Sequence, residues 1–238
     1  LEPLGADTAG SRYLDPDGSF PNHIPNPENE AAMQSIMDAV QESKADLGII
    51  FDTDVDRAGA VLSDGTELNR NRIIAMMAAI LLREHPGTTI VTDSITSTGL
   101  AAFIRKHGGV HHRFRRGYRN VINESMRLNR EGHDSQLAME TSGHGALKEN
   151  YFLDDGAYLV TRLLIELARA KKEGYTLESL IADLAEPAES KEFRMNILVP
   201  DFKAYGQKII DELNVYAASQ PGWSVAPDNF EGVRVNLD

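Results

Sequence analysis

The stretch Leu47–Arg57, LGIIFDTDVDR, joins a short apolar run to a loop with three alternating acidic residues. Its first five residues have the length and composition of a buried strand. Open α/β folds bind ligands where such strands end. If the loop is extended, its alternation turns Asp52, Asp54 and Asp56 toward one point, and three carboxylates suit a hard cation such as Mg²⁺. Arg57 can bind a phosphate through two hydrogen bonds. Acidic turns of this kind are also often only solvated, so the loop alone leaves both interpretations open.

Strands and amphipathic helices alternate on both sides of this loop. We expect helices at residues 28–43, 71–83, 98–107, 118–128 and 156–172, and strands at 47–51, 58–62, 88–92, 110–114 and 136–140. Alternation of this kind predicts parallel sheets covered by helices. The expected fold class is α/β, with consecutive βα domains whose mixed or parallel sheets are sandwiched by helices, plus the start of a C-terminal α+β domain.

The pattern divides the chain into three expected parts. Residues 1–68 are the latter part of an α/β domain that holds the acidic loop, and their first 29 residues are rich in Pro, Gly, Asp and Asn and predict a loop. Residues 69–186 form a second α/β domain. Residues 187–238 contain a linker and the beginning of the C-terminal α+β domain.

The last part changes in pattern. It contains the apolar stretch Phe193–Leu198, an expected helix at residues 202–213 and an expected strand at Val233–Leu237. The chain starts at Leu1 and stops at Asp238, directly after that strand. Both ends therefore look like cuts through a larger protein.

Composition restricts the class of protein. With 238 residues, of which 42% are hydrophobic, the chain can bury a core. Its net charge of -12 argues against a general nucleic-acid or membrane-surface binder. The absence of cysteine excludes disulfides and thiolate metal sites and fits a reducing compartment. No run is long enough to span a membrane. We therefore expect a cytoplasmic protein without nucleic-acid or membrane partners.

A second polar motif follows the expected strand at residues 136–140. Glu140, Ser142 and His144 alternate there, and Gly143 lets a ligand approach the backbone closely. If the strand continues, the three side chains share one face and suit sugar hydroxyl groups. The alternative is a surface loop with a capping serine and a solvated histidine.

A basic cluster lies between the two motifs. It consists of four arginines around Gly117 and Tyr118, namely Arg113, Arg115, Arg116 and Arg119. Such a cluster suits an anion, and the helix expected to start here also favours a phosphate at its N-terminus. A solvated basic edge is the commoner role of a charge run.

Together these segments resemble the α-D-phosphohexomutase family, the phosphoglucomutases and phosphomannomutases. Phe51–Arg57 is similar to the family's metal-binding DxDxDR loop, and Glu140–His144 to its sugar-binding GExSGH loop. Gly117–Arg119 stands where the family often has Gly-aromatic-Lys, and Gly156 after two aspartates resembles its acidic-Gly helix start. Three residues depart from the pattern: Met139 replaces a usual Gly, Arg119 a common Lys, and Asp154 a frequent Arg.

The resemblance implies a function for each motif. It implies Mg²⁺ as cofactor and a hexose phosphate as substrate, converted between the 1-phosphate and the 6-phosphate through a bisphosphorylated sugar. The implied metal ligands are Asp52, Asp54 and Asp56, the catalytic residues Arg57 and His144, and the substrate-binding residues Glu140, Ser142, His144 and Arg119. The family's reactive phosphoserine and its C-terminal phosphate-binding loop are not found in this sequence. We therefore expect them in missing N- and C-terminal domains of the same polypeptide, and expect this chain alone to be inactive.

Two other functions stay open at this point. A haloacid-dehalogenase-like phosphatase also carries DxD after an apolar strand, but Asp56 stands where that pattern wants Thr or Val. A non-catalytic sugar-phosphate-binding module descended from a mutase is compatible with the departures at Met139 and Asp154. The sequence does not fix which hexose phosphate is bound, nor the oligomeric state.

Overall fold

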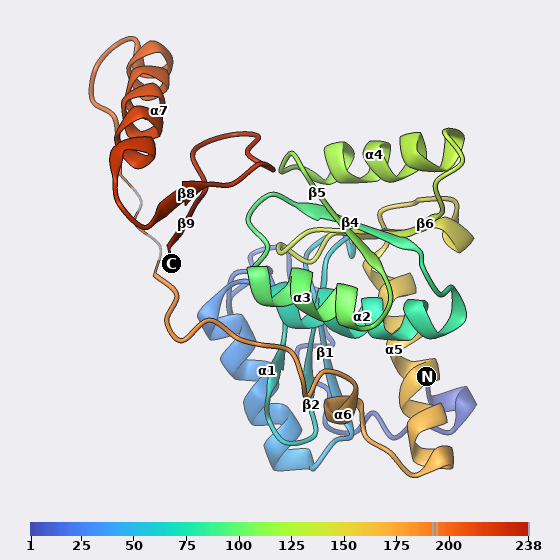
Figure 1. The fold of residues 1–238 in the computed structure, drawn as a ribbon. Helices are drawn as coiled ribbons and strands as arrows, with labels where there is room; N and C mark the ends of the chain where they lie inside the picture. The colour runs from blue at the N-terminus through green and yellow to red at the C-terminus, as the bar shows by residue number, and fades with distance from the viewer. Residues whose placement is uncertain (192, 194, 238) are drawn as a thin grey trace.

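Two β-sheets lie on opposite sides of one buried helix, α2 (Arg70–Glu84), in the computed structural model of the protein (Figure 1). The structure describes residues 1–191, 193 and 195–237. Helix α2 is apolar on all sides, and every residue from Ile73 to Leu82 is buried. A helix without a polar face belongs in the centre of a protein, because each of its sides needs an apolar neighbour.

The smaller sheet carries the acidic loop. Its strands are β1 (Leu47–Phe51), β2 (Ala58–Leu62) and β3 (Glu67–Leu68), in the order β1-β2-β3, and both pairs are antiparallel. Helix α1 (Glu30–Ser43) covers one face, where its residue Val40 packs with Val61. The expectation of parallel pairing is therefore wrong for this sheet, because the six residues between β1 and β2 are too few for a crossover connection.

The larger sheet has the order β5-β4-β6-β7. Strands β5, β4 and β6 run parallel, and β7 pairs antiparallel with β6, so the sheets are mixed. Helix α4 covers one face, and helices α2 and α3 lie on the other (Figure 1). The bounds of these elements are β4 Thr89–Asp93, α3 Thr98–Lys106, β5 Val110–Phe114, α4 Tyr118–Arg130, β6 Ser135–Met139 and β7 Gly145–Leu147.

One apolar core connects the two sheets. It joins Ala60, Leu62 and Leu68 of the smaller sheet to α2 and to the inner face of the larger sheet. Helix α5 (Gly156–Glu173) contacts β2, β7 and α2, and so spans both sheets. The remaining short helices are η1 (Glu2–Leu4), η2 (Lys148–Asn150) and α6 (Leu177–Leu180). The predicted domain boundary at 68/69 lies inside this shared core and stays a prediction.

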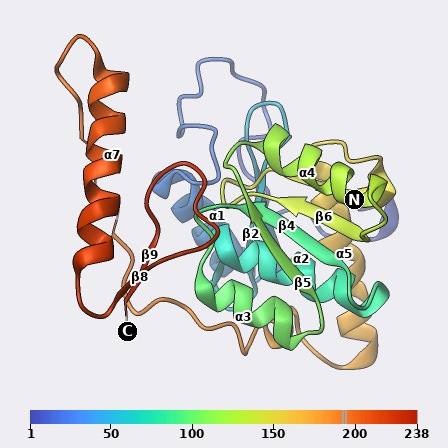
Figure 2. The same cartoon turned by 45° about the horizontal axis from the view of Figure 1, so that its top comes forward.

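We call residues 1–186 the body and residues 202–237 the C-terminal segment, whose long helix projects away from the body (Figure 2). The segment comprises α7 (Phe202–Ser219), β8 (Trp223–Val225) and β9 (Val235–Leu237). The helix runs past its expected end, and β9 is shorter than the expected strand. The expected α+β character is present, but β8 was not foreseen.

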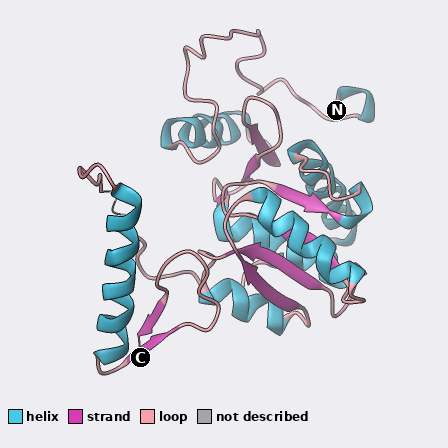
Figure 3. Ribbon diagram, turned by 90° about the horizontal axis from the view of Figure 1, so that it is seen from above, coloured by secondary structure: helices cyan, strands magenta, loops and turns pink. Residues whose placement is uncertain are grey.

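Two further predictions concern the stretch Phe193–Leu198 and the N-terminal loop. The apolar stretch Phe193–Leu198 includes Arg194, which lies outside the described residues, and its described residues are in no strand. The expected N-terminal loop is observed as a long irregular trace between η1 and α1 (Figure 3). None of the helices in the described part of the chain is both long and apolar enough to cross a membrane.

Candidate functional site

The acidic loop (residues 52–57) turns tightly between β1 and β2 and is not the extended segment that its alternation suggested. Val55 at its centre has a φ of 65°, in the left-handed region that β-branched residues rarely adopt. Carboxylate oxygens of Asp52, Asp54 and Asp56 lie within 4.8 Å of one another. The turn therefore brings the three predicted metal ligands together.

Arg57 is bound to the first carboxylate of this loop. Its Nε donates to Asp52 Oδ2 at 2.7 Å, and its backbone N–H donates to Asp52 Oδ1 at 3.2 Å. Burial of Asp52 opposes its ionisation, but the hydrogen bonds from Arg57 hold the pKa of Asp52 below its usual range. Arg57 Nη1 also donates to Asn26 Oδ1 at 3.3 Å. The guanidinium thus fixes the shape of the loop.

Asp56 is the member of the acidic group whose buried carboxylate is incompletely hydrogen-bonded. Its Oδ1 is buried and has no hydrogen-bond partner among the described residues. Burial raises the pKa of Asp56 to about 6; His144 opposes this rise, whereas Asp52 and Asp154 add to it. A buried carboxylate oxygen without a partner is costly. An all-oxygen donor set with such an oxygen fits a hard divalent cation of the Mg²⁺ type.

The sugar-loop motif (residues 140–144) is also a turn. Strand β6 ends at Met139, and the N–H of Gly143 donates to the carbonyl of Glu140 at 3.1 Å. Gly143 has a φ of 98°, and a Cβ there would lie 2.8 Å from the carbonyl oxygen of Ala58. The expected sharing of one strand face by alternate residues is therefore wrong, because the chain reverses here to enter β7.

The two loops lie against each other through their backbones. The N–H of Ala58 donates to the carbonyl of Gly143 at 3.3 Å, and Arg57 and His144 form an isolated antiparallel bridge. The N-terminus of α5 closes the acidic loop, because the N–H of Gly156 donates to the carbonyl of Val55 at 3.0 Å. Side chains 90 residues apart in sequence therefore share one site.

His144 reaches the acidic group directly. Its Nδ1 lies 2.8 Å from Asp154 Oδ2 and 3.6 Å from Asp56 Oδ2. Burial lowers the pKa of His144, but Asp154 and Asp56 more than offset this and raise it above its ordinary value. The ring of Tyr118 stacks on the imidazole, with centroids 4.9 Å apart.

Glu140 and Ser142 lie deeper than a surface loop would place them. Glu140 is buried, and its Oε1 accepts a hydrogen bond from the N–H of Gly117. Burial raises the pKa of Glu140. The Oγ of Ser142 is buried and has no partner among the described residues. Both side chains therefore offer polar atoms that could form further hydrogen bonds with a ligand.

The basic cluster divides between structural and exposed members. The side chain of Arg113 is 10% exposed; it pairs with Asp228 at 2.7 Å and donates to the carbonyl of Ser97 at 2.8 Å. The other three arginines of the cluster are exposed. Of these, Arg119 donates from Nε to the hydroxyl of Tyr118 at 3.1 Å, so it lies next to the residue that stacks on His144.

Two carboxylates of the site were not foreseen in their roles. Asp93 at the end of β4 is fully buried, accepts a hydrogen bond from Thr141 Oγ1 at 2.7 Å, and has its pKa raised by burial. Asp93 comes at the end of a β-branched run, as Asp52 comes after β1, and this position in the sequence could have identified it as a site residue. Asp154 was noted as a departure and as one of the two aspartates before Gly156, and its contact with His144 had no local signal.

Comparison with known proteins matches most of the chain to the family that its sequence motifs resemble. Residues 3–65 match the family model for phosphoglucomutase/phosphomannomutase, alpha/beta/alpha domain II, and residues 69–187 match the model for domain III. The chain is 30% identical to a phosphoglucomutase of Neisseria meningitidis serogroup A over 94% of its length. It is 32% identical to a phosphomannomutase/phosphoglucomutase of Pseudomonas syringae pv. tomato over 99% of its length. It spans about half of those relatives, 46% and 48%.

A solved structure shows the same fold. A phosphoglucomutase/phosphomannomutase family protein from Burkholderia thailandensis superposes with a TM-score of 0.76 at 30% identity, covering 94% of this chain and 44% of that chain. A putative phosphomannomutase from Thermus thermophilus shares the fold at 19% identity, with a TM-score of 0.55 over 67% of this chain and 35% of that one. On the two matching domain models and these relatives, this chain belongs to the phosphoglucomutase/phosphomannomutase family.

Proposed function

We propose that this chain supplies the metal-binding and sugar-binding loops of a phosphohexomutase, which interconverts hexose 1-phosphates and hexose 6-phosphates. The observation that carries the proposal is the junction of the two loops, where His144 Nδ1 lies 3.6 Å from Asp56 Oδ2. A divalent cation and a sugar bound by these loops are therefore neighbours. Family membership supports this function over a haloacid-dehalogenase-like phosphatase.

The acidic loop is the proposed Mg²⁺ site. Asp52, Asp54 and Asp56 hold the cation, and Arg57 keeps the loop in shape through Asp52. Bound Mg²⁺ neutralises charge on a phosphoryl group, and phosphoryl transfer depends mainly on such neutralisation and on positioning. The guanidinium of Arg57 lies beside this site and can also steady a phosphoryl oxygen.

The sugar loop is the proposed hexose site. The carboxylate of Glu140 accepts hydrogen bonds from sugar hydroxyls, and Ser142 Oγ, buried without a partner among the described residues, can do the same. His144 holds the sugar or its phosphate beside the metal loop. Arg119 contributes a more distant contact, because its guanidinium is exposed.

The remaining parts of the reaction are proposed to lie in other domains of the same polypeptide. A phosphoserine there donates the phosphoryl group, and a phosphate-binding loop holds the far end of the substrate. Relatives about twice as long as this chain support that division. We expect the 238-residue chain to bind Mg²⁺ and hexose phosphate without sustained turnover. The cytoplasmic location, and the absence of nucleic-acid and membrane partners, stay predictions.

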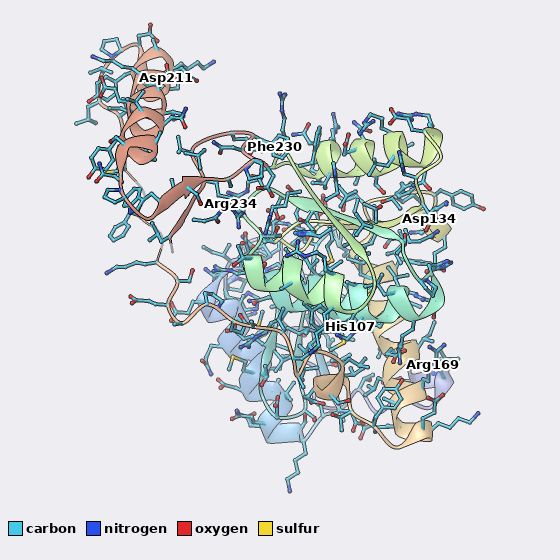
Figure 4. The ribbon with its side chains drawn as sticks, viewed as in Figure 1. His107, Asp134, Arg169, Asp211, Phe230 and Arg234 are labelled. Carbon is cyan, nitrogen blue, oxygen red and sulfur yellow. The ribbon has the colours of Figure 1, made fainter. Side chains whose placement is uncertain are left out.

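The metal assignment is tested by titrating Mg²⁺ into the chain and into its Asp54→Asn variant by calorimetry. Asp54 is exposed, so the substitution leaves the core unchanged, and we expect the affinity to fall roughly tenfold or more, the effect of losing one charged ligand. Asp211→Asn is the matched control, because Asp211 lies on α7, away from the site (Figure 4). Equal affinity in all three proteins would refute the metal site.

The sugar assignment is tested separately with glucose 1-phosphate and mannose 1-phosphate. Glu140→Gln removes the acceptor carboxylate while keeping its size, so we expect weaker sugar-phosphate binding and nearly unchanged Mg²⁺ affinity. The ratio between the two sugars ranks the substrates. Sustained conversion to the 6-phosphate by the chain itself would contradict the division of the reaction between domains.

A further inference from the structure

Asp154 holds the edge of the His144 ring. Its Oδ2 lies 2.8 Å from His144 Nδ1, and its Oδ1 accepts the N–H of Gly145 at 3.1 Å. The side chains of Asp154 and His144 are only 13% and 16% exposed, so water competes little for this contact. The carboxylate is thus fixed by the backbone of β7 before it binds the imidazole.

The same imidazole nitrogen faces a second carboxylate. Asp56 Oδ2 lies 3.6 Å from His144 Nδ1, beyond a normal hydrogen bond but within reach of a small rotation of the ring. The neutral imidazole carries one N–H hydrogen, and a hydrogen bond fixes which ring nitrogen holds it. Asp154 therefore competes with Asp56 for one N–H. In the observed arrangement Asp154 Oδ2 lies 0.8 Å closer to Nδ1 than Asp56 Oδ2 does.

The other side of the ring is held by an aromatic face. Tyr118 stacks on His144 with an interplanar angle of 21°. In the neutral ring with Nδ1 donating to Asp154, Nε2 is the acceptor nitrogen, and it makes no hydrogen bond within the part of the chain that the structure describes. An acceptor nitrogen beside the sugar loop suits a hydroxyl group of a bound hexose.

We propose that Asp154 is a positioning residue that draws the Nδ1–H of His144 away from Asp56, keeps the Asp56 oxygens free for the cation, and presents Nε2 to a sugar hydroxyl. This inference rests on the proposed function for the identity of the ligands.

The first test determines which nitrogen of His144 carries the hydrogen. Long-range ¹H–¹⁵N spectra of the labelled chain, recorded at alkaline pH where the ring is neutral, distinguish the two forms. We expect Nδ1–H in the wild type, where both carboxylate oxygens are acceptors. In Asp154→Asn the amide oxygen can keep the N–H of Gly145 while its NH2 donates to Nδ1, so we expect the hydrogen on Nε2. Hydrogen on Nε2 in the wild type would overturn the proposal, whatever ligands the protein binds.

The second test separates the role of Asp154 as the hydrogen-bond partner of Nδ1 from its charge. Asp154→Asn and Asp154→Ala both remove the charge, but only Ala removes that partner and frees His144 to donate to Asp56. We expect Mg²⁺ affinity of the Ala variant to fall roughly tenfold below that of the Asn variant, the scale of one charged hydrogen bond. In a His144→Ala background the difference should disappear. Equal affinities of the two variants would overturn the proposal.

Sugar binding gives the remaining outcome. Glucose 1-phosphate should bind Asp154→Asn more weakly than the wild type if Nε2 accepts a hydroxyl hydrogen, because Nε2 is a donor in that variant, and equal binding would overturn that part. A wild-type chain that binds no hexose phosphate, but shows the expected hydrogen position and Mg²⁺ difference, would refute the proposed function and leave the role of Asp154 toward Asp56 intact.

Discussion

The body and the C-terminal segment bury their apolar side chains in opposite ways. In the body, α2 has ten consecutive buried residues, from Ile73 to Leu82. In the segment, α7 buries only Ala217, while Ile209 and Leu213 are 44% and 43% exposed. A core supplies most of the free energy of folding. The body therefore has the means to fold as a unit, whereas the described part of the segment depends on what holds it in place.

The two regions also differ in how their parts are fastened. Inside the body, the acidic and sugar loops meet backbone to backbone, at Gly143 and Ala58. The segment meets the body through side chains: Arg113 pairs with Asp228, and Arg234 donates to the carbonyls of Ser94 and Thr96 at 2.8 and 3.0 Å. Phe230 and Arg234 lie on the side of the segment that faces the body (Figure 4). The site thus belongs to the rigid region, and the segment is attached by contacts that can open.

Truncation of one apolar residue in each region tests this difference most strongly. Met77 is fully buried, so Met77→Ala should lower the free energy of unfolding by about 2–5 kcal/mol. Leu213→Ala should cost less than about 1 kcal/mol, because the side chain is already half in water. Urea unfolding followed by circular dichroism measures both. A large loss from Leu213→Ala would show that the α7 face is covered in solution.

The backbone contact between the loops is tested with a matched pair of glycines. Gly143 and Gly132 have similar φ values, 98° and 87°, but only a Cβ at Gly143 meets another backbone atom. Gly132→Ala should cost about 1 kcal/mol from conformation alone, and Gly143→Ala about 3 kcal/mol, near the upper limit for strained positions. Mg²⁺ affinity should fall only in Gly143→Ala, because the two loops must separate. Equal effects would mean that the loops are not fixed by this contact.

The stability of the body should depend on pH through His111. Burial lowers the pKa of His111 to about 3, and Arg113 and Arg105 act in the same direction. Below pH 6.5, the ordinary pKa of histidine, His111 is protonated in the unfolded chain but stays neutral in the folded state. Stability from this group is therefore complete above about pH 6.5 and decreases as the pH falls, by about 2 kcal/mol between pH 7 and pH 5.

The variant His111→Gln isolates this contribution. Its unfolding free energy should lose about 2 kcal/mol less between pH 7 and pH 5 than that of the wild type, whatever its stability at pH 7. Other titrating groups are common to both proteins and cancel in the comparison. Parallel pH profiles would show that the imidazole, which lies 2.8 Å from Thr92 Oγ1, is not shielded as the structure describes.

The sequence predicted what local periodicity encodes. The buried stripe of Ala32, Met33 and Val40 determined α1, and the apolar run at residues 47–51 determined β1 to the residue. Strands β3 and β8 are two and three residues long, too short for an alternation to be recognised. The antiparallel pairing of β1 with β2 was missed because strands were assigned a direction from fold class, although a six-residue connection favours a hairpin.

The site was predictable only in part for a similar reason. The motifs predicted that Asp54 and Glu140 lie in loops that follow strands, which the structure shows at the ends of β1 and β6, because each loop is continuous in sequence. Their roles stay predictions. The contact of Asp93 with Thr141 joins residues 48 positions apart, and that of Asp154 with His144 depends on how α5 begins. The first contact follows from the parallel pairing of β4 with β6, and the second from the bridge between Asp154 and Ala146 of β7, and no local pattern contains either.

Opening the attachment of the C-terminal segment should have the smallest effect on global stability. Asp228→Ala removes the partner of Arg113 from the segment side, so the body keeps all of its own contacts. We expect amide exchange in β8 and β9 to accelerate roughly tenfold, the effect of one hydrogen bond between charged groups, while the free energy of unfolding changes by less than about 0.5 kcal/mol. Asp211→Ala, on the solvent side of α7, is the control and should leave exchange in both strands unchanged.

If β5 and β4 also exchange faster in Asp228→Ala, the segment stabilises the body and the two regions are one cooperative unit. If only β8 and β9 respond, the segment opens on its own, and the metal and sugar loops keep their geometry while it moves.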